Sequence, residues 1–359
     1  MRKIHYILLL AGIFLIGSCQ SIEQLSIDYM LPADVSFPAS LKRVAVVNNA
    51  ADLPEQHETA KATNEDSTHP LTRLHNGDAT LATEALADAL AEGNYFEEVV
   101  ICDSSLCTTP DENSEHTLSA REVNQLVNKL DVDFLIALEN IQLNSTRKIS
   151  YLSDWGFFYG TVDVKVFPTV RIYLPNRKGP MATINGNDSI FWEETAATES
   201  ALQAHLVDEK EMIRQASEFA GTVPVKHLLP YWKTVNRYFF SGGSVNMRDA
   251  AIYAREHNWD KAIVLWKLQY DKKKGKQQMY AAYNIALGYE MKDDITQALE
   301  WALKAQQIAR KVDKIDEQTE INSTRMPNFL MTSIYVNELQ ERKEGITRLN
   351  AQMERFREE

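Results

Sequence analysis

The residue with the clearest chemistry in this sequence is a cysteine near the amino terminus. Cys19 follows Ile16, Gly17 and Ser18, and an apolar run over residues 6–16 comes before them. That run is shorter than the ~20 residues a membrane-spanning helix needs, and two basic residues precede it. Positive charge, apolar run, small residues and cysteine follow in the order typical of a lipoprotein signal. We expect export, cleavage before Cys19 and acylation there, with an ordinary secretory signal as the alternative.

Two further cysteines, Cys102 and Cys107, are separated by four residues. Outside the cytosol such a pair can close a small loop, so we expect a disulfide, with two free thiols as the alternative. Two thiolates are too few for a zinc site without partners. His57, His69 and His75 stand in a polar stretch at spacings that fit no helical face. We therefore expect no metal site and no cofactor.

Signatures of known active sites are missing. The sequence contains no Gly-x-Ser-x-Gly elbow, no His-Glu-x-x-His pair, no Gly-x4-Gly-Lys-Ser/Thr loop and no Gly-x-Gly-x-x-Gly turn. Scattered residues can still meet in space, so these absences argue against an enzyme without excluding one. An envelope enzyme or a glycan-binding protein, with its site in the amino-terminal domain, stays as the alternative function.

Charge narrows the choice of partners. The chain holds 38 Lys and Arg against 50 Asp and Glu, a formal net charge of −12. Loss of residues 1–18 would make it −14, because two basic residues and no acidic residue are removed. A strongly acidic chain is repelled by phosphate backbones, which excludes nucleic acid as an expected partner. The protein must then be held at the membrane by its lipid anchor alone.

The densest aromatic cluster spans residues 151–159, with the sequence Tyr151-Leu-Ser-Asp-Trp-Gly-Phe-Phe-Tyr159. Exposed rings would stack on a sugar or a partner protein, whereas buried rings would pack a sheet against helices. We expect burial, because aromatic clusters beside a strand usually fill cores.

The strands that would position these residues are recognised by their periodicity. Three short apolar runs predict strands: residues 43–48, 95–101 and 133–138. Alternation of apolar and polar residues over 162–174 predicts a longer strand, in which Pro168 indicates a bulge or an edge position. Residues 182–192 return from it as the second strand of a hairpin. Residues 50–77 are polar and predict a loop.

Helices alternate with these strands. Residues 78–92 predict a helix that Gly93 ends, and Ser119 with Glu122 forms a capping box that begins another. The first domain is therefore predicted to be α/β (α+β), with a mixed sheet and helices over one face. From about residue 198 onward we expect helices only, including the aromatic segment 226–240.

An internal repeat marks the carboxyl-terminal part. Four alanines and two tyrosines recur at an offset of 36 residues: Ala250 with Ala286, Tyr253 with Tyr289 and Ala262 with Ala298. Small alanines let two helices cross closely, and the tyrosines fill the next layer. This skeleton resembles the tetratricopeptide repeat, whose period is about 34 residues. We expect two helical hairpins over about 245–310 and a degenerate capping pair toward residue 359, with chance alanine-rich helices as the alternative.

Further segments widen the resemblance. They are residues 171–175, 229–232 and 235–240, with Trp259 and Trp266. Together with Cys19 and the repeats, they resemble a family of Bacteroidetes lipoproteins that carry carboxyl-terminal tetratricopeptide repeats. The resemblance covers nearly the whole mature chain and implies architecture and location, but no activity. Ser67, in Asp66-Ser67-Thr68, also resembles sites that are O-glycosylated in Bacteroidetes envelopes, and Ser189 is a second, less accessible candidate.

These observations predict the domain order and the function. The parts are a signal peptide (1–18), a tether (19–40), an α/β domain (41–195) and an all-α domain (196–359). We expect a lipid-anchored cell-envelope protein of the outer membrane that binds a protein or peptide through its repeats and catalyses no reaction. The repeat register predicts an inner, partner-binding surface formed by Met247, Tyr280, Tyr283, Leu287 and Glu290. Packing of these side chains against the α/β domain is the alternative.

Overall fold

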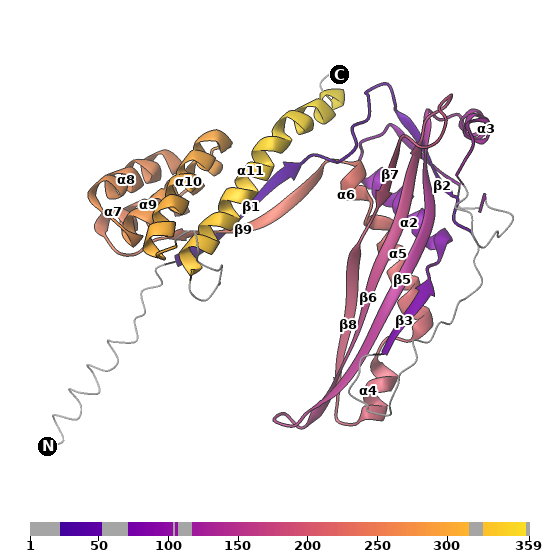
Figure 1. Cartoon of the computed structure of the whole chain (residues 1–359), viewed down its shortest axis with the longest axis horizontal. Coiled ribbons are helices and arrows are strands. Elements are labelled where there is room, and N and C mark those ends of the chain that lie inside the picture. The colour runs from indigo at the N-terminus through magenta and orange to yellow at the C-terminus, as the bar shows by residue number, and fades with distance from the viewer. Residues whose placement is uncertain (1–21, 52–70, 103–104, 107–116, 316–325, 357–359) are drawn as a thin grey trace. The chain divides into compact units, whose positions relative to one another are not determined.

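A computed structural model of the chain describes residues 22–51, 71–102, 105–106, 117–315 and 326–356. The chain forms two compact units (Figure 1). The α/β unit consists of Pro32–Tyr231 and Ala351–Glu359, and the helical unit consists of Met1–Leu31 and Trp232–Asn350. In the described part of the chain, no helix is long and apolar enough to cross a bilayer.

A seven-stranded mixed sheet forms the centre of the α/β unit (Figure 1). The strands are β2 (Arg43–Asn48), β3 (Leu71–Asn76), β4 (Glu98–Cys102), β5 (Phe134–Leu152), β6 (Phe157–Tyr173), β7 (Ala182–Asn185) and β8 (Asp188–Ala196). Their order is β4-β2-β5-β6-β7, while β3 also pairs with β5 and β8 with β6. β2 is parallel to β4 and to β5, and the remaining pairs are antiparallel. The predicted α/β class and mixed sheet are confirmed.

Two details of the strands were not visible in their periodicity. Residues 71–76 belong to the predicted loop, but they form β3 and pair with β5 from Arg147 to Gln142. Near Pro168, the register of the partner strand β5 shifts between Leu138 and Asn140, so the predicted irregularity lies mainly across from the proline. Pro168 itself stands between the stretches of β6 that pair with β8 and with β7, where its missing N–H costs no ladder bond.

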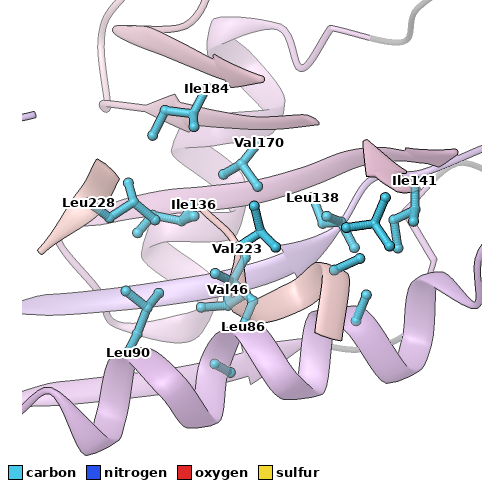
Figure 2. Close-up of a cluster of buried hydrophobic side chains, with 14 of the residues drawn as sticks. Val46, Leu86, Leu90, Ile136, Leu138, Ile141, Val170, Ile184, Val223 and Leu228 are labelled. Atoms are coloured by element: carbon cyan, nitrogen blue, oxygen red, sulfur yellow. The ribbon is translucent and has the colours of Figure 1, made fainter. Parts of the chain in front are cut away.

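Helices cover both faces of this sheet, where the prediction placed them on one. The helices on the larger core are α2 (Ala79–Glu92), α4 (Glu199–His205), α5 (Glu209–Thr222) and α6 (Val225–Leu228). Figure 2 shows Leu86 and Leu90 of α2 in this core with Val46 and Ile136 of the sheet. The opposite face of the parallel strands packs against α3 (Ala120–Leu130), which starts at the predicted capping box. Alternate residues of one strand thus enter different cores.

The close approach of α5 to α2 explains why the α/β unit is longer than predicted. A Cβ atom at Gly221 would lie 2.3 Å from the carbonyl oxygen of Ala82, so only glycine permits this contact. Nearby, the Ser217 hydroxyl accepts a hydrogen bond of 2.8 Å from the backbone N–H of Asp78. The predicted boundary at residue 195 is therefore wrong, because the helices between residues 199 and 228 complete the core of the sheet.

The helical unit also contains two strands that were predicted otherwise. β1 (Ile22–Leu31) lies in the predicted tether, and β9 (Tyr231–Phe240) lies in a segment predicted to be helical. They pair with each other in a two-stranded sheet. The Ser26 hydroxyl donates to Asn236 at 3.1 Å, and Thr234 donates to Asp28 at 2.6 Å. Each strand needs a partner more than 200 positions away, which local periodicity does not reveal.

The helices of this unit are α7 (Val245–Arg255), α8 (Trp259–Lys272), α9 (Lys276–Glu290), α10 (Ile295–Val312) and most of α11 (Pro327–Met353). The short 3₁₀ turn η1 (Glu354–Phe356) after α11 belongs to the α/β unit. The 36-residue offset holds in the backbone. His257 and Asp293 have φ angles of 57° and 59°, and both precede the residue that caps a helix. The predicted hairpins are confirmed as α7–α8 and α9–α10, and the four repeat alanines are buried. The predicted capping pair is instead the single helix α11.

Candidate functional site

The five residues predicted to form an open inner surface are covered by the chain itself. Four of them are buried and Tyr280 is half-buried. The Phe240 ring of β9 stacks on Tyr280 with 3.6 Å between ring centroids, and Tyr335 of α11 lies 4.9 Å from Tyr283. The structure thus corrects the expectation of an open groove. Tyr280, Tyr283 and Glu290 pack within the chain, but against β9 and α11 of their own unit. Met247 and Leu287 are buried.

A buried ion pair holds this packing together. Glu290 accepts two hydrogen bonds from the Arg237 guanidinium, at 2.9 and 3.0 Å, and one from the Tyr335 hydroxyl at 2.7 Å. Burial and the neighbouring Glu290 charge raise the pKa of Tyr335 well above its usual value, so this phenol stays protonated and donates. Glu338 and Arg342 of α11 also contact the pair. These ion pairs and hydrogen bonds hold α11 and β9 against α9.

The exposed apolar surface of the helical unit lies on α7 and α8 instead. Ile252 and Val264 are 48% and 58% exposed and line a hollow of about 740 Å³. Val245 and Leu268, one helical turn away from lining residues on each helix, are also exposed. We call these four side chains the α7–α8 apolar surface. Ile263 and Trp266 of α8 contact Gly288 of α9, so the apolar surface faces away from the second hairpin.

Acidic residues border this surface. Asp249, Glu256 and Asp260 line the hollow together with the ammonium group of Lys261. Asp260 also accepts a hydrogen bond from Lys292, so Asp249 and Glu256 carry most of the negative charge of the rim. Lys261 lies 5.1 Å from the centroid of the Tyr253 ring. The surface therefore offers an apolar floor with a negative rim. The repeat register did not reveal it, because it uses positions outside the alanine and tyrosine skeleton; the signal in the sequence was apolar residues four and seven apart on the outer faces of the two helices.

A second hollow lies in the α/β unit, at the carboxyl end of β2. That strand stands between its parallel neighbours β4 and β5, and the helices before these two strands cover opposite faces. Ligands of open α/β sheets bind at such a switch point. The cleft has a volume of about 970 Å³. Its polar lining residues include Asn48, His75, Asp78, Glu209, Lys210 and Arg214.

The polar groups of this cleft are held by hydrogen bonds. His75 Nε2 lies 2.9 Å from the Ser145 hydroxyl, and its Nδ1 lies 3.4 Å from a Glu209 carboxylate oxygen. Near the same strand end, Glu139 accepts 2.8 Å bonds from Asn49 and from the Tyr173 hydroxyl. Burial, together with the Glu139 charge, raises the pKa of Tyr173 to about 12. The arrangement can orient a polar ligand through hydrogen bonds.

The aromatic cluster at residues 151–159 is largely exposed, which contradicts the prediction of burial. Trp155 is 76% exposed and Tyr151 is 55% exposed, while Phe157, Phe158 and Tyr159 are half-buried. The exposed rings lie at the turn between β5 and β6, whereas Phe158, farther along β6, already packs against the larger core. The prediction assumed that an aromatic cluster beside a strand faces a core. At the end of a hairpin, the turn extends past the core and leaves its rings exposed.

Several predicted sites lie outside the described residues. These are Cys19, Cys107, Ser67, His57 and His69. Cys102 ends β4 and is half-buried. Its disulfide stays a prediction, because the partner Cys107 is not among the described residues. Within the described ranges, no group of three or more His, Cys, Asp or Glu side chains could hold a metal ion.

Two family comparisons match the chain. A family described as a domain of unknown function (DUF8603) matches residues 41–240, which is more than half of the chain. A second, also described as a domain of unknown function (DUF6340), matches residues 248–341. A comparison with curated proteins gives no match. The first match ends at the last residue of β9, and the second begins within α7 and runs through α8, α9 and α10 into α11.

Proposed function

The chain belongs to the family described as a domain of unknown function (DUF8603), which assigns it no activity. From the cysteine motif and the exposed surface of the helices, we propose that it is a lipid-anchored cell-envelope protein that binds a protein partner through its helical hairpins. The anchor is Cys19, the membrane is the outer membrane, and no catalysis or cofactor is involved. The observation that carries the binding role is the α7–α8 apolar surface. Its exposed side chains have no cover among the described residues, whereas the inner surface is filled by β9 and α11.

The shape of this surface favours an α-helical partner. The outer sides of two neighbouring helices form a hollow into which a third helix can lay its apolar face. Ile252 and Val264 would contact that apolar face. The carboxylates of Asp249 and Glu256 favour a helix whose flanks carry Lys or Arg, since opposite charges at a rim guide association and register. The proposed partner is therefore a segment that forms a basic amphipathic helix.

Site-directed cross-linking in membranes tests the binding role. A photoreactive residue placed at Val264 should give a discrete cross-linked product, because this side chain lies on the proposed contact surface. Adding Ile252→Asp should reduce that product by about tenfold, since a charge on the apolar floor loses its solvation on binding. The matched control is Leu303→Asp, on α10, where an exposed apolar residue also becomes acidic.

The two variants distinguish the possible results of the cross-linking experiment. Loss of the product with Ile252→Asp but not with Leu303→Asp supports the surface. Equal products in both variants would rule it out as the partner site. The anchor is tested independently: Cys19→Ala should leave unprocessed precursor and remove acyl labelling, and labelling that persists in this variant would refute acylation at Cys19.

The cleft in the α/β unit favours a second candidate function, the binding of a small polar ligand such as a glycan fragment. Its position at the switch point of the parallel strands and its polar lining support this reading. A ligand at a hundred times its Kd would stabilise the unit by about 2.7 kcal/mol. Glycan fragments should then raise the melting temperature of the wild type but not that of Glu209→Gln. If no glycan fragment raises the melting temperature of the wild type, the cleft does not bind glycans.

A further inference from the structure

The end of the β5–β6 hairpin exposes aromatic rings where a turn usually carries polar residues. Among the exposed large apolar side chains in the described ranges, Trp155 has the highest exposed fraction, 76%. Its turn is well ordered in its hydrogen bonding: the N–H groups of Trp155 and Gly156 both donate to the carbonyl oxygen of Leu152, at 3.0 and 2.8 Å. Gly156 adopts a φ of 71°, which a residue with a side chain rarely takes. The turn therefore holds the indole out in solvent.

Rings lie on both faces of this hairpin end. Tyr151 pairs with Phe158 across the strands, and Leu152 pairs with Phe157. Neighbouring residues of a strand point to opposite faces, so the first pair lies on one face and the second on the other. The Tyr151 and Phe158 rings are 4.9 Å apart, and the Trp155 ring lies 6.3 Å from Phe157. Phe158 also packs against the larger core, so the rings that remain exposed are Tyr151, over Phe158 on one face, and Trp155, beside Phe157 on the other.

Charge is almost absent from the same segment. Between residues 149 and 158, Asp154 is the only charged residue. Polar contacts begin at the base of the hairpin end, where the Tyr159 hydroxyl donates to Glu193 at 2.6 Å and Ser150 donates to the Tyr159 carbonyl oxygen at 3.5 Å. Tyr151 and Trp155 each combine an apolar ring with a hydrogen-bonding tip, the combination that is enriched where hydrocarbon meets lipid headgroups.

We propose that the β5–β6 hairpin end is a membrane-contact site that inserts Trp155 and Tyr151 into the headgroup region of a phospholipid bilayer. Rings on both faces fit end-on entry into a medium that surrounds the tip. A sugar platform would need its rings on one face with polar groups at the rim, and a protein groove would meet one face only. The inference rests on the proposed lipid anchor in one respect: an anchored chain keeps the tip near a bilayer, so a weak contact is enough.

The low charge also indicates which lipids matter. The tip has no basic residue between positions 149 and 158, and the whole chain is acidic, so anionic headgroups give no attraction. Binding should therefore occur on zwitterionic phosphatidylcholine and should not increase when phosphatidylserine is added. This separates the proposed contact from the common electrostatic attachment of basic segments.

Fluorescence quenching by brominated lipid tests the proposal. The processed chain, with its acylation checked by intact mass, is reconstituted into phosphatidylcholine vesicles that contain a bromine-labelled acyl chain. The protein has six tryptophans, so the contribution of Trp155 is the difference between wild type and Trp155→Phe. The matched control is Trp232→Phe on β9, which removes another tryptophan that is 68% exposed. Tyr151→Ser tests insertion itself, because it leaves the Trp155 fluorophore in place.

We expect bromolipid quenching of the wild type, its loss by at least about threefold in Trp155→Phe, and no loss in Trp232→Phe. Tyr151→Ser should move the remaining emission back toward that of a water-exposed indole. Equal quenching in wild type and Trp155→Phe would overturn the proposal. So would a Trp155 emission change caused by soluble oligosaccharide or a protein partner without vesicles. As a further control, an unacylated chain, verified by intact mass, is added to the same vesicles. This control distinguishes a missing lipid anchor from a hairpin end that does not insert.

Discussion

Replacing Glu290 by glutamine removes the negative charge from the most deeply buried ion pair of the helical unit. The Glu290 side chain has no exposed surface, and Arg237 is 5% exposed. Glutamine keeps the volume and one acceptor oxygen, but its amide group turns donors toward the Arg237 donors. The guanidinium would then keep only Glu338, which is 28% exposed, as a carboxylate partner within its own cluster.

The expected cost follows from this geometry. Removing one partner of a buried ion pair costs about 3–5 kcal/mol, because the other charge is left without compensation in a medium of low dielectric constant. The retained Tyr335 bond to the amide oxygen offsets part of this loss, so we expect about 3 kcal/mol. The control Glu338→Gln alters the partly exposed partner of the same Arg237, and its cost should be about 1 kcal/mol.

Hydrogen exchange of α11 and β9 peptides is the appropriate assay, because a chain of two units need not unfold in one transition. A loss of 3 kcal/mol predicts exchange about a hundredfold faster in Glu290→Gln, at 1.4 kcal/mol per tenfold. Glu338→Gln should accelerate exchange by less than about tenfold. If both variants exchange at the same rate, the buried pair is not what fastens these elements over the inner surface, and the reasoning fails.

Four further predictions concern other parts of the chain. Gly221→Ala should lower the stability of the α/β unit by about 1–3 kcal/mol in thermal unfolding, because the new methyl group would meet the Ala82 carbonyl oxygen; exposed Glu218→Ala on the same helix should change it by less than about 0.5 kcal/mol. Ala298→Leu should overpack the buried helix crossing by ~1–3 kcal/mol, whereas Lys273→Ala should be nearly silent in the same denaturant series, and equal midpoints would refute the repeat register. The pKa of Tyr173 rises from 10 to about 12 on folding. Its contribution to the free energy of unfolding is therefore complete below pH 10 and is lost between pH 10 and 12. The decline in stability over this pH range should be smaller in Tyr173→Phe, by up to about 2.7 kcal/mol, when unfolding is measured at alkaline pH. Cys102 and Cys107 should resist alkylation without reductant in exported protein, since a disulfide there would contribute at most about 2–3 kcal/mol, and labelling of both thiols would disprove it.

The features that could be predicted are those whose causes lie within a few positions of one another. The capping box of α3 forms as expected, because Ser119 and Glu122 satisfy each other's backbone groups in one turn. The two hairpin turns recur at the predicted offset, since His257 and Asp293 take the same left-handed conformation before equivalent caps. Tyr283 and Glu290, which the repeat register placed on one surface, both contact Tyr335.

What covers that surface could not be predicted in the same way. The partners of Glu290 come from β9 and from α11, which are 53 and 45 positions away at Arg237 and Tyr335. The exposed rings of the β5–β6 turn were misjudged for a related reason: their burial depends on where the neighbouring helices end, which the residues of the turn do not encode.

By itself, the sequence determined the class of the first domain, the helical hairpins and their 36-residue offset, because propensity, periodicity and spacing are local properties. The lipoprotein signal is read from the same local pattern and stays a prediction. Only the tertiary structure decided that residues 22–31 pair with residues 231–240, that α4 to α6 complete the sheet's core, and that α11 fills the inner surface. The physical reason is that the type of a side chain indicates whether it must be buried or paired. Which residue buries or pairs with it depends on the distant element that folding brings into contact.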